Sequence, residues 1–189
     1  MSLPKHKYLL TYRYAEMIYD LTFEFCRIFL SDLGSKRTRE QMEQAARSGK
    51  QNIIEGIGQS QTSKKGEMKL LGVAKASIEE LLADYEDFLR KRQLSIWKKT
   101  DDKVKRLQHY VYRISSLSNL SDLGDLKEKP TLPARAIIAA NLLLTLCHIE
   151  TFLLSKQIAR AESDFITKGG FTENLFKKRL QGKMERASP

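Results

Sequence analysis

Apolar residues between positions 8 and 33 recur at steps of four and three, and this spacing constrains the fold more than any other feature of the chain. One stripe runs from Tyr8 to Leu33, and a second from Thr11 to Ile28 lies beside it. Such a repeat is that of an α-helix. Together the stripes make an apolar face wider than one helix contact requires. One can line a core, while the other needs a further helix or another subunit.

Three more segments carry helical spacing, and few residues interrupt them. Gly and Pro number only 10 and 4, and no alternation typical of strands is present. The prediction is an all-α, up-down-up-down four-helix bundle with an additional short helix and loop insertion and a basic C-terminal tail. The expected bounds are helices 8–33, 39–59, 63–92 and 134–166 within a bundle domain 1–166, the insertion 93–133, and the basic segment 167–189.

Positive charge is concentrated in two parts of the chain. The net charge is +10, of which residues 34–69 and 167–189 contribute +4 each. Clustered cations suit a polyanion, either nucleic acid or an acidic protein face, and the alternative is an ordinary solvated surface with a basic tail. The candidate contact residues are Lys36, Arg37, Arg39, Arg47, Lys50, Lys64, Lys65, Lys69, Lys177, Lys178 and Arg179.

The expected mode of nucleic-acid binding is contact with phosphates, without sequence readout. Aromatic residues are not interleaved with the basic clusters, so stacking of single-stranded bases has little support. If the second and third helices are antiparallel, Lys64 and Lys65 lie at the far end from Arg37. A single continuous patch is therefore not guaranteed within one subunit.

Motifs for nucleotide, metal or nucleophilic chemistry fail on spacing. Gly49-Lys50 is followed by Gln51, and no glycine precedes it at the spacing of a phosphate-binding loop. The three histidines are scattered and form no metal-ligand pair. Cys147 and His148 are adjacent in a helix, so their side chains do not face each other. We therefore expect a protein that is not an enzyme, with no catalytic residues, cofactor or metal.

Both cysteines, Cys26 and Cys147, fall in apolar helical patterns, as expected for reduced, buried thiols in a cytoplasmic protein. The opening residues carry charges without a continuous apolar core, so we expect no signal peptide. The most apolar run, Ala136–Ile149, is shorter than the roughly 20 residues of a membrane span. We expect no membrane association.

Two short motifs resemble a known family. The first contains Ala45, Ser48, Asn52 and Gly56 within AARSGKQNIIEGIG, and the second has Ala74, Ser77, Glu80 and Leu81. Residues 37–90 resemble the four-helix-bundle family that includes proteins encoded in intervening sequences of bacterial 23S rRNA genes. The GGFTE tail is similar to a subgroup with a four-helix-bundle suffix domain. The matching polar and glycine positions are Ser48, Asn52, Glu55, Gly56, Gly58, Ser77 and Glu80.

The resemblance implies an up-down four-helix bundle, often assembled as a homopentamer, and relatives of similar build that bind a reverse transcriptase and nucleic acid. For most members of that family no biochemical activity is established. For Asn52, Glu55, Ser77 and Glu80 we favour a buried polar cluster that ties two helices together, with a binding site as the alternative. We expect Gly49 and Gly56 to allow close backbone contact.

Two functional hypotheses remain. The first is a non-enzymatic oligomer that binds nucleic acid, RNA rather than DNA, through its basic surfaces. The alternative is an interaction scaffold or accessory subunit that docks a partner protein, with no specific nucleic-acid role.

Overall fold

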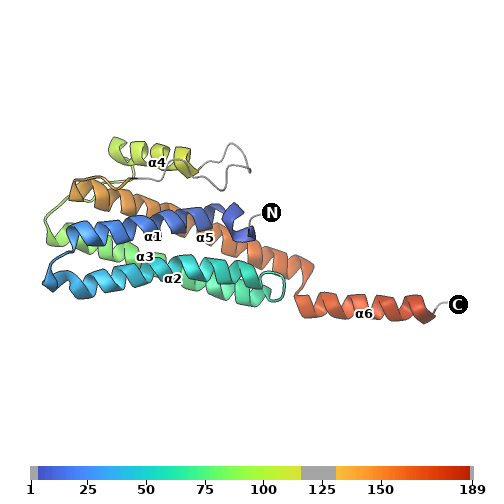
Figure 1. The fold of residues 1–189 in the computed structure, drawn as a ribbon. Coiled ribbons are helices and arrows are strands. Elements are labelled where there is room, and N and C mark those ends of the chain that lie inside the picture. Colours follow the sequence, from blue (N-terminus) through green and yellow to red (C-terminus); the bar gives the residue numbers. More distant parts are fainter. Residues whose placement is uncertain (1–3, 116–130, 188–189) are drawn as a thin grey trace.

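The computed structural model describes residues 4–115 and 131–187, and all regular structure within these ranges is helical. The loop predicted between the short fourth helix and Pro133 falls largely on residues 116–130, outside the described residues. The α-helices, labelled in Figure 1, are α1 (Leu10–Phe29), α2 (Lys36–Gln59), α3 (Lys64–Lys91), α4 (Asp102–Ser115), α5 (Ala136–Lys168) and α6 (Phe171–Ala187).

Four long helices lie side by side around a common core. Helix α1 packs against α2 and α5, and α3 packs against the same two helices. Successive members of this set run in opposite directions (Figure 1). Helix α4 lies mainly against α5. Helix α6 projects beyond the ends of the other helices (Figure 1).

Helix α1 buries the middle of both apolar stripes within a single chain. Ala15 and Cys26 of the first stripe and Ile18 and Phe25 of the second are fully buried, because α1 contacts α2, α5 and, less extensively, α4. Residues at the ends of the stripes, Tyr8, Ile28 and Leu33, are exposed. The width of this face therefore does not require a second subunit, contrary to one of the two explanations that the sequence left open.

Aromatic residues fill the core with their polar atoms satisfied. The rings of Phe25 and Tyr85 meet edge to face with centroids 5.1 Å apart. The hydroxyl of the fully buried Tyr85 forms a 2.8 Å hydrogen bond with the hydroxyl of Thr22. A buried tyrosine usually needs such a partner, so this pair fixes the register of α1 against α3.

The connection between α1 and α2 differs from the predicted bounds. Helix α1 ends at Phe29 rather than at residue 33, and α2 begins at Lys36 rather than at residue 39. The Asp32 carboxylate accepts a 2.9 Å hydrogen bond from the Ser35 backbone N–H, which stabilises a tight 3₁₀ turn. Because this turn leads directly into α2, Thr38 lies inside the first turn of the helix and is not its N-cap, although a threonine followed three residues later by Gln41 is a typical start of a helix.

Candidate nucleic-acid interface

Two chain reversals that are about a hundred residues apart meet at one end of the molecule. We call this region the turn end, defined as residues 60–64 between α2 and α3 and residues 164–174 around the junction of α5 and α6. The two segments enclose a cavity of about 300 Å³. Its lining residues are Ser60, Gln61, Lys64, Asp164, Lys168, Gly169, Phe171 and Asn174.

The reversal between α2 and α3 is held by short side chains. The Ser60 hydroxyl donates to the Ile57 carbonyl at 2.7 Å. The Ser63 hydroxyl accepts from the Gly66 backbone N–H at 3.0 Å and caps the start of α3. Gly58 is still inside α2, so the reversal lies just beyond that glycine and not at it.

The reversal between α5 and α6 depends on Gly169. Its φ of 74° and ψ of 172° lie in a region essentially restricted to glycine. The following Gly170 backbone N–H donates to the Glu173 carboxylate at 3.1 Å, so a residue of the first turn caps α6. The break that Gly169-Gly170 predicted is therefore present, and it sets the direction in which α6 leaves the other helices.

Cations from different helices converge on one carboxylate at the turn end. The pKa of Asp164 is lowered, first by its hydrogen bond with Lys168 and then by the charges of Lys168, Lys64 and Arg160. Lys64 belongs to α3, whereas the other three residues belong to α5. Lys64, a candidate contact residue from the sequence, thus lies near Lys168 and Arg160, which were not among the candidates.

Helix α6 presents its charges to solvent. Lys177, Lys178 and Arg179 are exposed, and none of them forms an ion pair with any residue that the structure describes. Lys65 and Lys69 are likewise exposed on the first turns of α3. With Lys64, six of the predicted contact residues therefore belong to α6 or to the adjacent start of α3.

The other predicted cations lie elsewhere. Lys36, Arg37 and Arg39 are at the opposite end of α2, as an antiparallel α2 and α3 require. Lys50 lies 3.7 Å from the centroid of the Tyr19 ring and faces α1. Arg47 is exposed midway along α2. The two ends of α2 are therefore distinct surfaces, and the predicted cations form no single patch within the chain.

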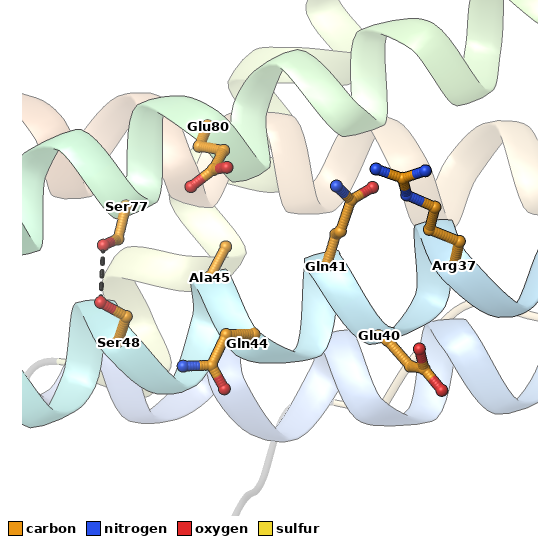
Figure 2. A pocket seen from close by; sticks show the side chains of 8 residues that line it. All are labelled: Arg37, Glu40, Gln41, Gln44, Ala45, Ser48, Ser77 and Glu80. Atoms are coloured by element: carbon orange, nitrogen blue, oxygen red, sulfur yellow. Dashed lines mark hydrogen bonds between the residues drawn. The ribbon is translucent and has the colours of Figure 1, made fainter.

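Three of the family-motif residues, Ser48, Ser77 and Glu80, line a groove of about 390 Å³ between α2 and α3 (Figure 2). The hydroxyls of Ser48 and Ser77 form a 2.8 Å hydrogen bond across it. The Asn52 amide donates to the Ser48 carbonyl at 2.9 Å and to its hydroxyl at 3.2 Å. The Ser48–Ser77 bond therefore ties α2 to α3, whereas Asn52 supports Ser48 from within α2.

The two glutamates of the proposed polar cluster are not part of it. Glu55 and Glu80 are both exposed, although Glu80 lines the groove in Figure 2. Their positions on α2 and α3 lie farther around each helix from its buried face than Asn52 and Ser77 do. The order of residues in a motif does not by itself show which of them face the partner helix. That depends on the angular position of each residue around the helix axis.

The glycines of the motif differ in their surroundings. A Cβ added to Gly49 would lie 2.7 Å from Ile78 Cδ1, so α2 and α3 approach closely there. At Gly56 the nearest atoms would be 3.4 Å away, which is ordinary contact, and at Gly58 nothing lies within 4 Å. Of these three positions, a side chain would therefore fit least easily at Gly49, where Ile78 would have to move.

Sequence analysis missed a buried carboxyl group in α5. Glu150 is fully buried, and neither carboxyl oxygen has a hydrogen-bond partner among the described residues. Burial raises its pKa well above the usual value. Extending the apolar stripe of α5 in steps of three and four from Cys147 through Glu150 to Leu154 would have placed it in the core.

The described residues offer no group of three or more histidine, cysteine or acidic side chains placed to hold a metal ion. Burial raises the pKa of Cys26 to about 12 and raises that of Cys147 further. Both thiols are therefore protonated at neutral pH, which makes them poor nucleophiles.

One helical stretch, Ala136–Met184, passes a length and hydropathy test for crossing a membrane. The most apolar window is 61% buried against the rest of the molecule. Core helices of soluble proteins pass the same test, so this observation alone does not indicate a membrane span.

Comparison with models of protein families, with curated proteins and with solved structures found no match to this chain. The resemblance to the 23S rRNA intervening-sequence family, which rests on the two short motifs, therefore stays a prediction.

Proposed function

We propose that the chain is an up-down-up-down four-helix bundle that binds nucleic acid without catalysing a reaction, and that α6 and the turn end form its binding surface. The observation that carries this proposal is the exposure of unpaired cations on a helix that projects from the rest of the molecule. Lys177, Lys178 and Arg179 contribute little to folding where they stand, because no described acidic group pairs with them.

A polyanion is the ligand that such a surface fits best. Each phosphate contact releases condensed counterions, and this gain drives binding that is largely independent of sequence. Beyond the cations of α6, Lys64 and Lys168 line the turn-end cavity together with Phe171 and Asn174 of α6, and Lys65 follows Lys64 in α3. A strand lying along α6 can therefore stay in contact with positive charge when it reaches the other helices.

The family resemblance favours RNA over DNA and implies a homo-oligomer. In such an assembly several α6 helices would contact one nucleic-acid molecule, which raises the overall affinity without new contacts. The buried thiols of Cys26 and Cys147 suit a reducing compartment, and we propose that the protein acts in the cytoplasm.

The groove between α2 and α3 favours a second candidate function, the docking of a partner protein. Its lining combines Arg37 with Glu40 and Glu80 around the Ser48–Ser77 hydrogen bond, a mixture of charges more suited to a protein surface than to phosphates. A Ser77→Arg substitution, which fills the groove, would abolish capture of such a partner at physiological salt. Reversal of the α6 charges would leave capture unchanged.

A salt titration tests the proposed function. The affinity of the wild-type protein for a labelled RNA is measured by fluorescence anisotropy at several salt concentrations. If four of these cations contact phosphates, a plot of the logarithm of the association constant against the logarithm of the salt concentration should have a slope of about −3. Absence of binding at low salt, or binding that does not depend on salt, would contradict the proposal.

A further inference from the structure

The turn-end cavity contains the groups needed to hold a nucleic-acid base. Phe171 is 49% exposed and forms part of its lining, so an aromatic face is available for stacking. Ser60, Gln61 and Asn174 bring hydroxyl and amide groups to the same cavity. A volume of about 300 Å³ is at the small end of the range for ligand pockets.

The charge inside the cavity favours a base over a phosphate. Asp164 stays ionised at neutral pH, because its pKa is lowered by the hydrogen bond from Lys168 and by nearby cations. A carboxylate repels phosphate but accepts hydrogen bonds from the amino groups on base edges. Lys64 and Lys168 lie at the same cavity, where they can contact the phosphates on either side of the base.

Helix α6 continues this combination of aromatic and cationic groups. Phe176 is 66% exposed, and Arg179 and Lys183 follow it three and seven residues later, on the same face of the helix. Lys178 lies seven residues after Phe171, about 10 Å farther along the helix axis and on the same face. The expectation that aromatics are not interleaved with the basic clusters was therefore wrong for α6, because helical periodicity brings together residues that are not adjacent in sequence.

We propose that the turn end and α6 bind a single strand of nucleic acid, with one unpaired base stacked on Phe171 in the cavity and a second stacked on Phe176. This inference rests on the proposed function and adds the class of nucleic acid. Exposed aromatic rings stack on unpaired bases, whereas a duplex keeps the faces of its bases inside the stack.

The alternative occupant of this surface is a second copy of the chain, since Leu175, Leu180 and Met184 are also exposed on α6. Charge argues against contact between two α6 helices. Residues 167–189 carry +4 on every copy, and like charges oppose such docking, whereas a polyanion complements them.

The test compares a labelled 12-nucleotide RNA that does not pair with itself with a 12-base-pair RNA duplex, using fluorescence anisotropy at low salt. The single strand should bind at least tenfold more tightly. Phe171→Leu should weaken its binding about tenfold, in keeping with the loss of one stacked base. Phe171→Tyr keeps an aromatic face and should stay within about twofold of the wild type. The matched control is Phe152→Leu, at a phenylalanine that is 60% exposed on α5, and it should change nothing.

Two results would overturn the inference and leave the proposed function intact. In the first, duplex and single strand bind equally and Phe171→Leu has no effect, although binding keeps its salt dependence. In the second, Phe171→Leu changes the sedimentation coefficient of the protein but not its RNA affinity, so that Phe171 contacts a second copy. Absence of RNA binding by the wild type would instead contradict the proposed function itself.

Discussion

The two ends of α2 carry cations in different settings. At the turn end and along α6, Lys177, Lys178 and Arg179 extend into solvent without an ion pair among the described residues. At the other end, which we call the connection end (residues 30–40 and 87–92), Lys36 pairs with Glu40 at 3.9 Å and Arg90 pairs with Asp87 at 2.7 Å.

The connection end uses its cations within the fold. The Arg92 guanidinium lies 3.9 Å from the centroid of the Phe88 ring and also donates to the Phe29 carbonyl at 3.2 Å. Such contacts hold the end of α3 against α1, although each exposed pair contributes little on its own. The difference teaches that the number of cations in a sequence segment does not identify a binding surface. Cations of both ends form ion pairs, because Lys64 pairs with Glu67 and Lys168 pairs with Asp164 at the turn end. What distinguishes the two surfaces is α6, a projecting helix whose Lys177, Lys178 and Arg179 have no ion pair among the described residues.

The largest expected effect comes from reversing charges at the two ends. Changing Lys177, Lys178 and Arg179 together to Glu should weaken RNA binding at low salt at least a hundredfold, because attraction to phosphate becomes repulsion. The same change at Lys36, Arg37 and Arg39 should weaken it less than threefold. Fluorescence anisotropy measures both affinities, and circular dichroism confirms that both variants stay helical. Equal losses for the two variants would remove the distinction between the ends.

The middle of the molecule is the next place to test. Glu150→Leu removes a buried, unpaired carboxyl and should raise the free energy of unfolding at pH 7 by about 1–3 kcal/mol. RNA affinity should not change, because Glu150 is far from either end of α5 and has no exposed surface. Urea denaturation measures the stability. A loss of RNA affinity in this variant would mean that binding depends on the core.

The same residue predicts a pH dependence. Burial raises the pKa of Glu150 in the folded state, so the folded protein holds this proton more tightly than the unfolded chain does. Stability is therefore greatest at acidic pH and falls as the pH rises above the usual glutamate pKa towards the raised one. Relative to Glu150→Gln, the wild type should therefore lose stability between pH 5 and pH 8, as measured by urea denaturation. Parallel pH profiles would contradict this account.

Much of the fold could be predicted from the sequence, because the helices follow from local periodicity. The stripe of α1 and the break at Gly169-Gly170 both follow from residues close together in the chain. The pairing of the two reversals at the turn end was not accessible, since about a hundred residues separate them and no pattern links Lys64 to Phe171. Glu150 was accessible in principle, because its spacing from Cys147 and Leu154 is that of a core position.

The joint before α6 should show a smaller effect. Gly169→Ala places a Cβ in a backbone conformation that costs other residues about 1–3 kcal/mol, and its new atom would overlap the Glu173 carboxylate. We expect α6 to change direction and RNA affinity to fall about tenfold, with the melting temperature of the other helices unchanged. Gly58→Ala is the control, because nothing lies within 4 Å of its added Cβ. Equal affinities for the two variants would show that the direction of α6 does not matter.

The smallest expected effect concerns Asp164, the carboxylate that lies among Lys64, Lys168 and Arg160. Asp164→Asn removes an acceptor for the amino groups of a bound base, and the loss of its repulsion of phosphates partly offsets this, so binding of the single strand should weaken only about twofold. The control, Asp87→Asn at the connection end, should leave affinity unchanged. Because the pKa of Asp164 is already lowered, mild acidification to pH 5 should not reproduce the effect in the wild type. Stronger binding by Asp164→Asn would instead indicate that this carboxylate only repels phosphates.

Hydrogen–deuterium exchange with and without RNA tests the central claim most directly, because it locates the contact on the protein. In the free protein, α6 amides should exchange faster than those of α1, α2, α3 and α5, since a projecting helix of 17 residues has little tertiary packing to stabilise it. With RNA, exchange should slow in residues 60–69 and 164–184 and stay unchanged in residues 30–40. Protection confined to the connection end, or none along α6, would contradict the account.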